Sequence, residues 1–191
     1  MSDIARRSLI VGGAGLLAGV GMFASGTARA ATPSSTVAWD FSFPAIDEGM
    51  LKFADMKGRV LLVTNTASFC GFTYQYEGLE KLHAQLTPQG FDVIGIPSQD
   101  FGQESADNAT VKGFCDATFG VKFPMTGLLH VKGEQADPFY KWVKAERNWQ
   151  PGWNFNKVLI GRDGRIKGTF GSNDEPTGAA LREAIATELK A

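Results

Sequence analysis

The chain has 191 residues, of which 43% are hydrophobic and 20% charged, with 19 Lys and Arg against 20 Asp and Glu. A net charge of −1 without a basic cluster argues against a nucleic-acid-binding surface. The length suits one domain with its own core, preceded by a leader segment.

The first 30 residues have the pattern of a cleavable export signal. Arg6 and Arg7 stand directly before an apolar, glycine-rich run over residues 9–25, and residues 28–30 (ARA) form a site that signal peptidase cuts. Paired arginines at this point are similar to the twin-arginine signal. We expect residues 1–30 to be removed, which leaves one domain at 31–191 in a bacterial periplasm. A membrane anchor is disfavoured because glycines interrupt the run and no stop-transfer pattern follows.

Residues 59–97 have the pattern of a strand, a helix and a second strand. The near-continuous apolar, β-branched run over 59–66 predicts a strand buried on both faces. Thr73 is a candidate N-cap for a helix whose apolar residues recur at helical spacing as far as Leu86. Residues 91–97 predict a second buried strand, so the three elements form a βαβ unit with parallel strands.

The elements that follow complete the fold. They are a helix over 107–119, a short strand over 127–131, a helix over 137–147, two strands over 156–160 and 165–170 joined by an Asp-Gly turn, and a helix over 177–189. This order is that of the thioredoxin fold, an α/β fold with a central mixed β-sheet flanked by helices. Its chemistry lies where the first strand of the βαβ unit meets its helix, and Cys70 stands at that junction.

Cys70 and Cys115 are the two cysteines of the chain. In an oxidising compartment they predict a disulfide, and composition leaves open whether it is a structural staple or a redox pair. The position of Cys70 just before a helix indicates a reactive thiolate, because helix N-termini present unpaired N–H groups. Gly71 would let the backbone turn closely around the sulfur. Phe69 and Phe72 would disfavour the thiolate, because apolar neighbours raise the pKa of a thiol.

The segment NTASFCGFT at residues 65–73, with QYEGLEKL at 75–82, closely resembles the peroxidatic-cysteine motif of the glutathione peroxidase family. The resemblance continues through GIPSQDFGQE (95–104), FGVKFPM (119–125), PFYKW (138–142) and WNFNK (153–157). These blocks cover nearly all of residues 31–191 in order. The chain is therefore identified as a member of that family.

The resemblance implies a thiol peroxidase that reduces hydrogen peroxide or organic hydroperoxides without a cofactor. Cys70 falls on the residue that attacks the peroxide and becomes a sulfenic acid, and Trp153 and Asn154 fall on two hydrogen-bond donors beside it. Indole and carboxamide N–H groups stabilise the negative charge on a departing oxygen. His83 and His130 are isolated in the sequence, so no metal site is expected.

Cys115 stands where the thioredoxin-using members of the family carry a second cysteine that condenses with the sulfenic acid. The resemblance thus implies a Cys70–Cys115 disulfide, reduced by a thioredoxin-like protein or a low-molecular-weight thiol. We expect the segment over 101–120 to open before the two sulfurs meet. The linker between Lys144 and Trp153 is short, whereas tetrameric members that use glutathione carry an insertion there. A monomer is expected, with glutathione a poor reductant.

Asp100 departs from the family pattern. The usual Pro-Cys-Asn-Gln-Phe-Gly aligns with residues 97–102, so Asp100 replaces a glutamine that donates to the reacting sulfur. Asp100 either stays protonated and donates, or turns away and accepts from backbone N–H groups or Trp153. In the second arrangement Gln99 or Asn154 would donate instead. We favour the second, because a neutral carboxyl at pH 7 requires a pKa shift of roughly three units.

Two other interpretations remain open. A disulfide exchanger would use Cys-x-x-Cys, but Thr73 stands where the second cysteine would be. A non-catalytic peroxide sensor or binding module could form the same disulfide and pass the oxidation to a partner protein. Repeated turnover of peroxide would separate the enzyme from the sensor.

Overall fold

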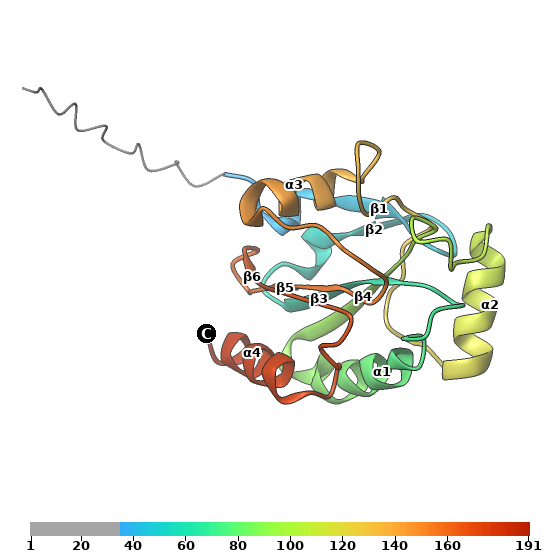
Figure 1. Ribbon diagram of the computed structural model, residues 1–191. Helices are drawn as coiled ribbons and strands as arrows, with labels where there is room; N and C mark the ends of the chain where they lie inside the picture. Colours follow the sequence, from blue (N-terminus) through green and yellow to red (C-terminus); the bar gives the residue numbers. More distant parts are fainter. Residues whose placement is uncertain (1–34) are drawn as a thin grey trace, which may run out of the picture. The chain divides into compact units, whose positions relative to one another are not determined.

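The computed structural model describes residues 35–191, so the predicted signal peptide lies outside the described residues (Figure 1). Within this range the strands are β1 (Ser42–Pro44), β2 (Met50–Lys52), β3 (Val60–Thr66), β4 (Phe91–Pro97), β5 (Lys157–Ile160) and β6 (Ile166–Phe170). The α-helices are α1 (Gln75–Leu86), α2 (Asn108–Phe119), α3 (Pro138–Arg147) and α4 (Ala179–Lys190). No helix within 35–191 is long and apolar enough to cross a membrane.

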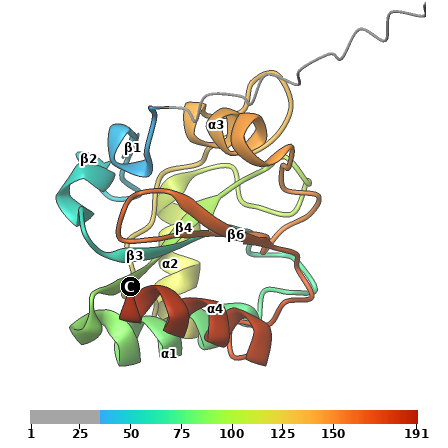
Figure 2. The ribbon, with the colours of Figure 1, turned by 90° about the vertical axis from the view of Figure 1, so that its left-hand side faces the viewer.

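Four strands form one mixed sheet in the order β4-β3-β5-β6. β3 and β4 are parallel, whereas β5 runs antiparallel to both β3 and β6. α1 and α4 cover one face of the sheet, and α3 covers the other face with the small β1–β2 sheet (Figures 1 and 2). This arrangement confirms the predicted thioredoxin-like fold.

β3 is the central support of the molecule, because all seven of its residues are buried. Leu62 belongs to the core cluster that includes residues of α1, α2 and α4, and Leu61 and Val63 belong to the cluster on the α3 side. Side chains alternate between the two faces of a strand, so a strand covered on both faces carries apolar side chains on both, as residues 60–63 do. Each such side chain stabilises the fold by about 1.5–3 kcal/mol. Cys70 follows the carboxyl end of this rigid strand.

The predicted strand over 127–131 is wrong. Gly127 N–H donates to Pro44, Leu128 N–H to the side chain of Asn108, and Leu129 N–H to Pro97. Three successive donors with three different partners do not form a ladder. Isolated bridges occur instead just before this segment, at Met125 and Thr126. The sequence analysis also missed β1 and β2, which are three residues each.

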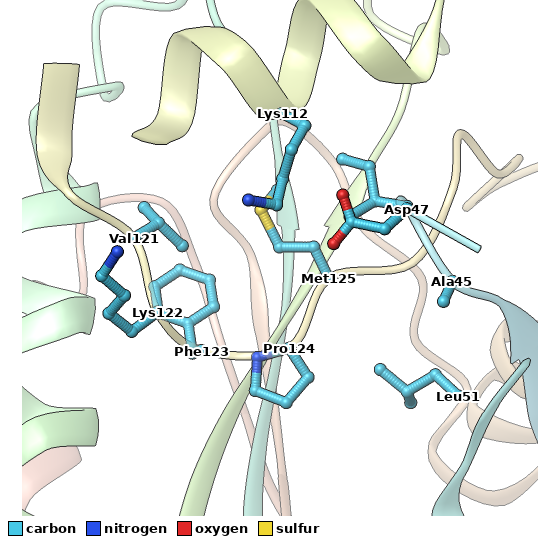
Figure 3. A pocket seen from close by; sticks show the side chains of 10 residues that line it. Ala45, Asp47, Leu51, Lys112, Val121, Lys122, Phe123, Pro124 and Met125 are labelled. Atoms are coloured by element: carbon cyan, nitrogen blue, oxygen red, sulfur yellow. The ribbon is translucent and has the colours of Figure 1, made fainter. Parts of the chain in front are cut away.

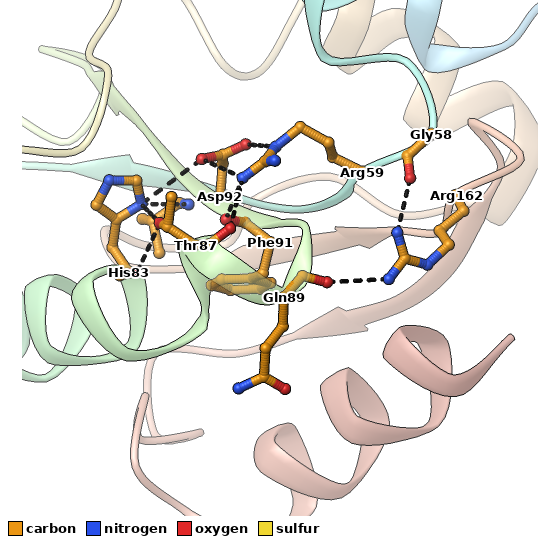
Figure 4. A network of polar contacts seen from close by, with 9 residues as sticks. Gly58, Arg59, His83, Thr87, Gln89, Phe91, Asp92 and Arg162 are labelled. Atoms are coloured by element: carbon orange, nitrogen blue, oxygen red, sulfur yellow. Dashed lines mark hydrogen bonds and ion pairs between the residues drawn. The ribbon is translucent and has the colours of Figure 1, made fainter.

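A polar network connects the N-terminal end of β3 to β4 and to the end of α1 (Figure 4). Arg59 pairs with Asp92 of β4 and donates to the carbonyl of Thr87. His83 accepts the N–H of Val93 through Nδ1 at 3.4 Å, and burial lowers the pKa of His83. His83, in the last turn of α1, is thus a structural residue.

Lys157 ties β5 to the start of α1. It is fully buried, and its ammonium donates to Gln75 Oε1 at 2.6 Å and to the Asp174 carbonyl at 2.7 Å. Burial lowers the pKa of Lys157 to about 8. Gln75 in turn donates to the Ser172 carbonyl at 2.6 Å. The 171–174 loop is therefore held against the first turn of α1.

Candidate active site

The loop between β3 and α1 holds Cys70, and Thr73 closes this loop. The Thr73 hydroxyl accepts the N–H of Cys70 at 3.0 Å and donates to the Ala67 carbonyl at 2.9 Å. The prediction that Thr73 caps α1 is wrong, because the helix begins at Gln75 after Tyr74, without a side-chain cap. Thr73 instead fixes the backbone on either side of the cysteine.

The sulfur of Cys70 receives a backbone N–H. Phe72 N–H donates to Sγ at 3.4 Å, and Cys70 is only 9% exposed. This hydrogen bond holds the sulfur against the backbone of the loop. Gly71 has no positive φ, and a Cβ there would meet no atom within 4 Å. The backbone at position 71 therefore does not require glycine, contrary to our expectation.

Asn65 of β3 anchors the segment that carries Trp153. Its side chain donates to the Trp153 carbonyl at 3.0 Å and accepts the N–H of Asn156 at 3.1 Å. Its backbone accepts the N–H of Phe155 at 2.7 Å and donates to the carbonyl of Asn156 at 3.2 Å. The four bonds fix residues 153–156 beside the strand that leads to Cys70. The sequence signal was a buried amide within an apolar strand, which requires partners.

Gln103 joins two sides of the site. Its backbone carbonyl accepts the N–H of Phe69 at 3.0 Å, and its side-chain oxygen accepts from Asn154 Nδ2 at 3.0 Å. Asn154 is fully buried, whereas Trp153 is 40% exposed and packs on Phe101 with ring centroids 5.3 Å apart. The sequence analysis missed Gln103, although it lies in the block GIPSQDFGQE.

Asp100 turns toward the 130–132 loop. Its carboxylate accepts from His130 Nδ1 and Val131 N–H, both at 2.6 Å, and from Lys132 N–H at 3.2 Å. Partial burial alone would raise the pKa of Asp100, but these hydrogen bonds outweigh it and lower the pKa. Asp100 therefore adopts the second arrangement weighed above, with His130 in place of Trp153 as the side-chain donor. Gln99 is exposed, and its backbone carbonyl accepts the N–H of Gly102 at 2.8 Å.

Cys115 lies fully buried on the inner face of α2. Burial is the main cause that raises its pKa to about 11, although the nearby Tyr76 hydroxyl opposes this rise. Phe114 packs against Phe69 with ring centroids 6.4 Å apart, so the residues before the two cysteines are in contact. Both cysteines are free thiols.

Glu104 is a buried carboxylate that the sequence analysis also missed. One oxygen accepts the N–H groups of Ser68 at 3.2 Å and Ser105 at 2.8 Å. Burial raises the pKa of Glu104, and these bonds offset the rise only in part. Glu104 thus places a titratable group directly beneath the Cys70 loop.

Five aromatic residues, here called the aromatic rim, lie in the Cys70 loop and in the segments bonded to it. The rim consists of the exposed residues Phe69, Tyr74 and Trp153 together with the half-buried Phe72 and Phe101. Phe72 packs on Tyr74, and Phe101 packs on Trp153. Contiguous exposed aromatic groups mark binding surfaces. The rim gives this part of the protein an exposed apolar surface.

Two other features lie apart from this site. Within residues 35–191 no group of three or more His, Cys, Asp or Glu residues could hold a metal ion. A hollow between the 45–51 segment, α2 and residues 121–125 has Phe123 and Met125 in its lining and Lys112 at its edge (Figure 3). None of its lining residues belongs to the Cys70 loop or the 153–156 segment.

Comparison with known proteins gives a consistent result. The family model described as glutathione peroxidase matches residues 38–144. The chain is 38% identical over 143 residues to a glutathione peroxidase of Lactococcus lactis subsp. cremoris, covering 72% of this chain and 91% of that protein. It is 37% identical over 152 residues to the hydroperoxy fatty acid reductase gpx1 of a Synechocystis species, covering 72% and 88%.

Solved structures agree with the fold. The crystal structure of Trgpx in its apo form superposes with a TM-score of 0.65 at 34% identity, covering 82% of this chain and 97% of that one. A thioredoxin-family thiol:disulfide interchange protein of Chlorobium tepidum superposes with a TM-score of 0.63 at 17% identity, covering 83% and 99%. The second similarity concerns the fold alone.

Proposed function

The chain belongs to the glutathione peroxidase family and is a peroxidase, and from that premise we propose that Cys70 reduces hydroperoxides and that Cys115 resolves the oxidised sulfur. The observation that carries this proposal is the Cys70 loop. Its sulfur accepts the Phe72 N–H and lies in a loop that carries the exposed Phe69, so a nucleophile is held close to the surface, where a peroxide can reach it.

The first step is attack of the Cys70 thiolate on one oxygen of the peroxide. The O–O bond breaks, Cys70 becomes a sulfenic acid, and the departing alkoxide or hydroxide takes up a proton. Donors that face the departing oxygen lower the barrier. The Trp153 indole and the Asn154 carboxamide are the donors we assign, and the Asn65 bonds hold their segment in place.

Gln103 supplies the carboxamide that the Asp100 position lacks. The Asp100 carboxylate is bound to the 130–132 loop and, once ionised, has no proton to donate. The Gln103 oxygen accepts from Asn154, which orients the amide and leaves its NH₂ group as a donor. In this proposal Gln103, three residues after Asp100, acts in place of the glutamine of the family.

The second step joins the two cysteines. Cys115 attacks the Cys70 sulfenic acid, water leaves, and a Cys70–Cys115 disulfide forms. α2 buries only Val111 and Cys115 among its residues, so it separates from the core more easily than α1, which buries four residues. A thioredoxin-like dithiol then reduces the disulfide by exchange. Relatives named glutathione peroxidase-like peroxiredoxins support a thiol reductant.

The aromatic rim favours hydroperoxides that carry an apolar chain. Phe69 is 67% exposed and Trp153 is 40% exposed beside a buried sulfur, so an acyl chain can cover them while the peroxide group reaches Cys70. The Synechocystis relative is named a hydroperoxy fatty acid reductase. We also assign the protein to the periplasm as a monomer, on the strength of the Arg6-Arg7 signal and the short linker before Trp153.

A turnover assay tests the proposal. The purified protein is incubated with a thioredoxin system and either hydrogen peroxide or linoleic acid hydroperoxide, and NADPH consumption is followed. We expect many equivalents to be consumed, with a higher kcat/KM for the lipid hydroperoxide. Cys70→Ser should abolish turnover, and Cys115→Ser should stop after one oxidation of Cys70. Consumption that ends at one equivalent in the wild type would contradict the enzyme and indicate a peroxide sensor.

A further inference from the structure

One carboxylate oxygen of Glu104 accepts hydrogen bonds, and the other has no donor among residues 35–191. Oε1 accepts from Ser68 and Ser105, whereas Oε2 is buried and has no hydrogen-bond partner among residues 35–191. The residue is 8% exposed. A buried oxygen without a donor is unfavourable, so the site favours the uptake of a proton.

The groups around Glu104 can carry a proton. Burial is the first cause of the high pKa values of Cys115 and Tyr76, and the charge of Glu104 raises both further. Tyr76 of α1 and Cys115 of α2 lie in one core cluster, and the Cys70 loop that Glu104 holds packs on α2 through Phe69 and Phe114. The hydroxyls of Tyr76 and Ser68 are also buried without a partner among the described residues. Tyr76 and Cys115 are thus titratable groups whose pKa values respond to the charge of Glu104.

Cys115 requires a base in order to react. With a pKa of about 11, about one thiol in ten thousand is ionised at pH 7. The thiolate is the nucleophile in disulfide formation. Transfer of the proton to Glu104 keeps one negative charge in the buried region, so the step adds no charge to an apolar environment.

We propose that Glu104 is the proton acceptor for Cys115 during disulfide formation, an inference that rests on the proposed resolving role of Cys115. The Glu104 carboxylate takes the S–H proton when α2 shifts and brings the thiol or the Tyr76 hydroxyl within hydrogen-bond distance. The Cys115 thiolate attacks the Cys70 sulfur and the S–O bond breaks. The departing hydroxide takes the proton from Glu104 and leaves as water. Thiol and sulfenic acid become a disulfide and water, and Glu104 returns to its carboxylate form.

Glu104→Gln is the matched variant, because its side-chain carbonyl can still accept from Ser68 and Ser105 but cannot take up a proton. One equivalent of hydrogen peroxide is added without reductant at pH 5–10. Quenched samples are analysed by mass spectrometry for Cys70 sulfenic acid, trapped with dimedone, and for the Cys70–Cys115 disulfide. We expect sulfenic acid formation within about twofold of wild type and disulfide formation at least about tenfold slower at pH 7.

The pH profile separates proton transfer from a structural effect. In wild type the disulfide rate should be level near neutral pH and fall at acidic pH as Glu104 becomes protonated. In Glu104→Gln it should rise about tenfold per pH unit, because hydroxide must then ionise Cys115. Glu104→Asp keeps a carboxylate and should react faster than Glu104→Gln.

Two results have different meanings. Equal disulfide rates and parallel pH profiles in wild type and Glu104→Gln, or a Glu104→Asp variant as slow as Glu104→Gln, would overturn the role of Glu104. Failure of the wild type to form any Cys70–Cys115 disulfide would instead overturn the proposed function.

Discussion

At the scale of single residues, Asp100 connects the loop after β4 to residues 130–132. Both of its oxygens accept hydrogen bonds, one from His130 and the other from the N–H groups of Val131 and Lys132. A residue bound in this way contributes to stability through its ionised form. Its effect on the chemistry at Cys70 should be small.

Asp100→Asn therefore separates stability from catalysis. The amide has one acceptor oxygen in place of two, so the free energy of unfolding should fall by about 1–3 kcal/mol. The rate of Cys70 oxidation at pH 7 should stay within about threefold of wild type, whereas Trp153→Phe should lower it by about tenfold or more. Chemical denaturation and stopped-flow fluorescence measure the two effects. A steep loss of Cys70 oxidation in Asp100→Asn would identify Asp100 as a hydrogen-bond donor instead.

The same substitution should change the dependence of stability on pH. The pKa of Asp100 is lower in the folded protein than its ordinary value of 3.8. Ionised Asp100 thus stabilises the fold above about pH 3.8, and this contribution is lost as the pH falls through the lowered pKa. Denaturation of Asp100→Asn should lack that part of the acid sensitivity.

At the scale of elements, the 153–156 segment depends on β3 for its position. Asn65 uses its side-chain amide, its side-chain oxygen, its backbone N–H and its carbonyl to hold this segment. Phe155 within the segment has a φ of 58°, a left-handed conformation that is unfavourable for an aromatic residue. The Asn65 bonds thus hold a backbone that would otherwise relax.

Asn65→Asp tests this dependence. The carboxylate can still accept from Asn156, but it places an oxygen against the Trp153 carbonyl in place of a donor. Cys70 oxidation should slow by about tenfold or more, and the free energy of unfolding should fall by about 1–3 kcal/mol. Thr64→Val is the control, because the Thr64 hydroxyl is buried without a partner among residues 35–191. Equal oxidation rates in the two variants would exclude Asn65 as a positioning residue.

The sequence predicted elements better than it predicted local contacts. β3, β4, α1 and α2 lie within a few residues of their predicted ranges, because long apolar periodicities and end signals such as Gly120 determine them. Thr73 was misassigned because a hydroxyl before a helix can cap it or close a loop, and only the tertiary fold selects one. The roles of Gln103 and Glu104 depend on partners distant in sequence, which no local pattern specifies.

At the scale of the whole molecule, the proposed periplasmic location rests on residues 1–30, which lie outside the described structure. The proposed twin-arginine route requires both arginines of the signal. Replacing Arg6 and Arg7 with Lys should leave precursor in the cytoplasm, as judged by fractionation and immunoblotting. Unchanged export of the variant would indicate the general secretory route.

The burial of Cys115 links the redox chemistry of the molecule to the packing of its core. In the proposed cycle, disulfide formation withdraws Cys115 from the core and reduction returns it there. Reduction then restores the packing of Cys115 in the core, and the free energy of that packing stabilises the dithiol. Each 1.4 kcal/mol of this packing energy makes the reduction potential of the disulfide less negative by about 30 mV. The fold itself favours the dithiol state, so a reductant of modest driving force is sufficient to restore the enzyme.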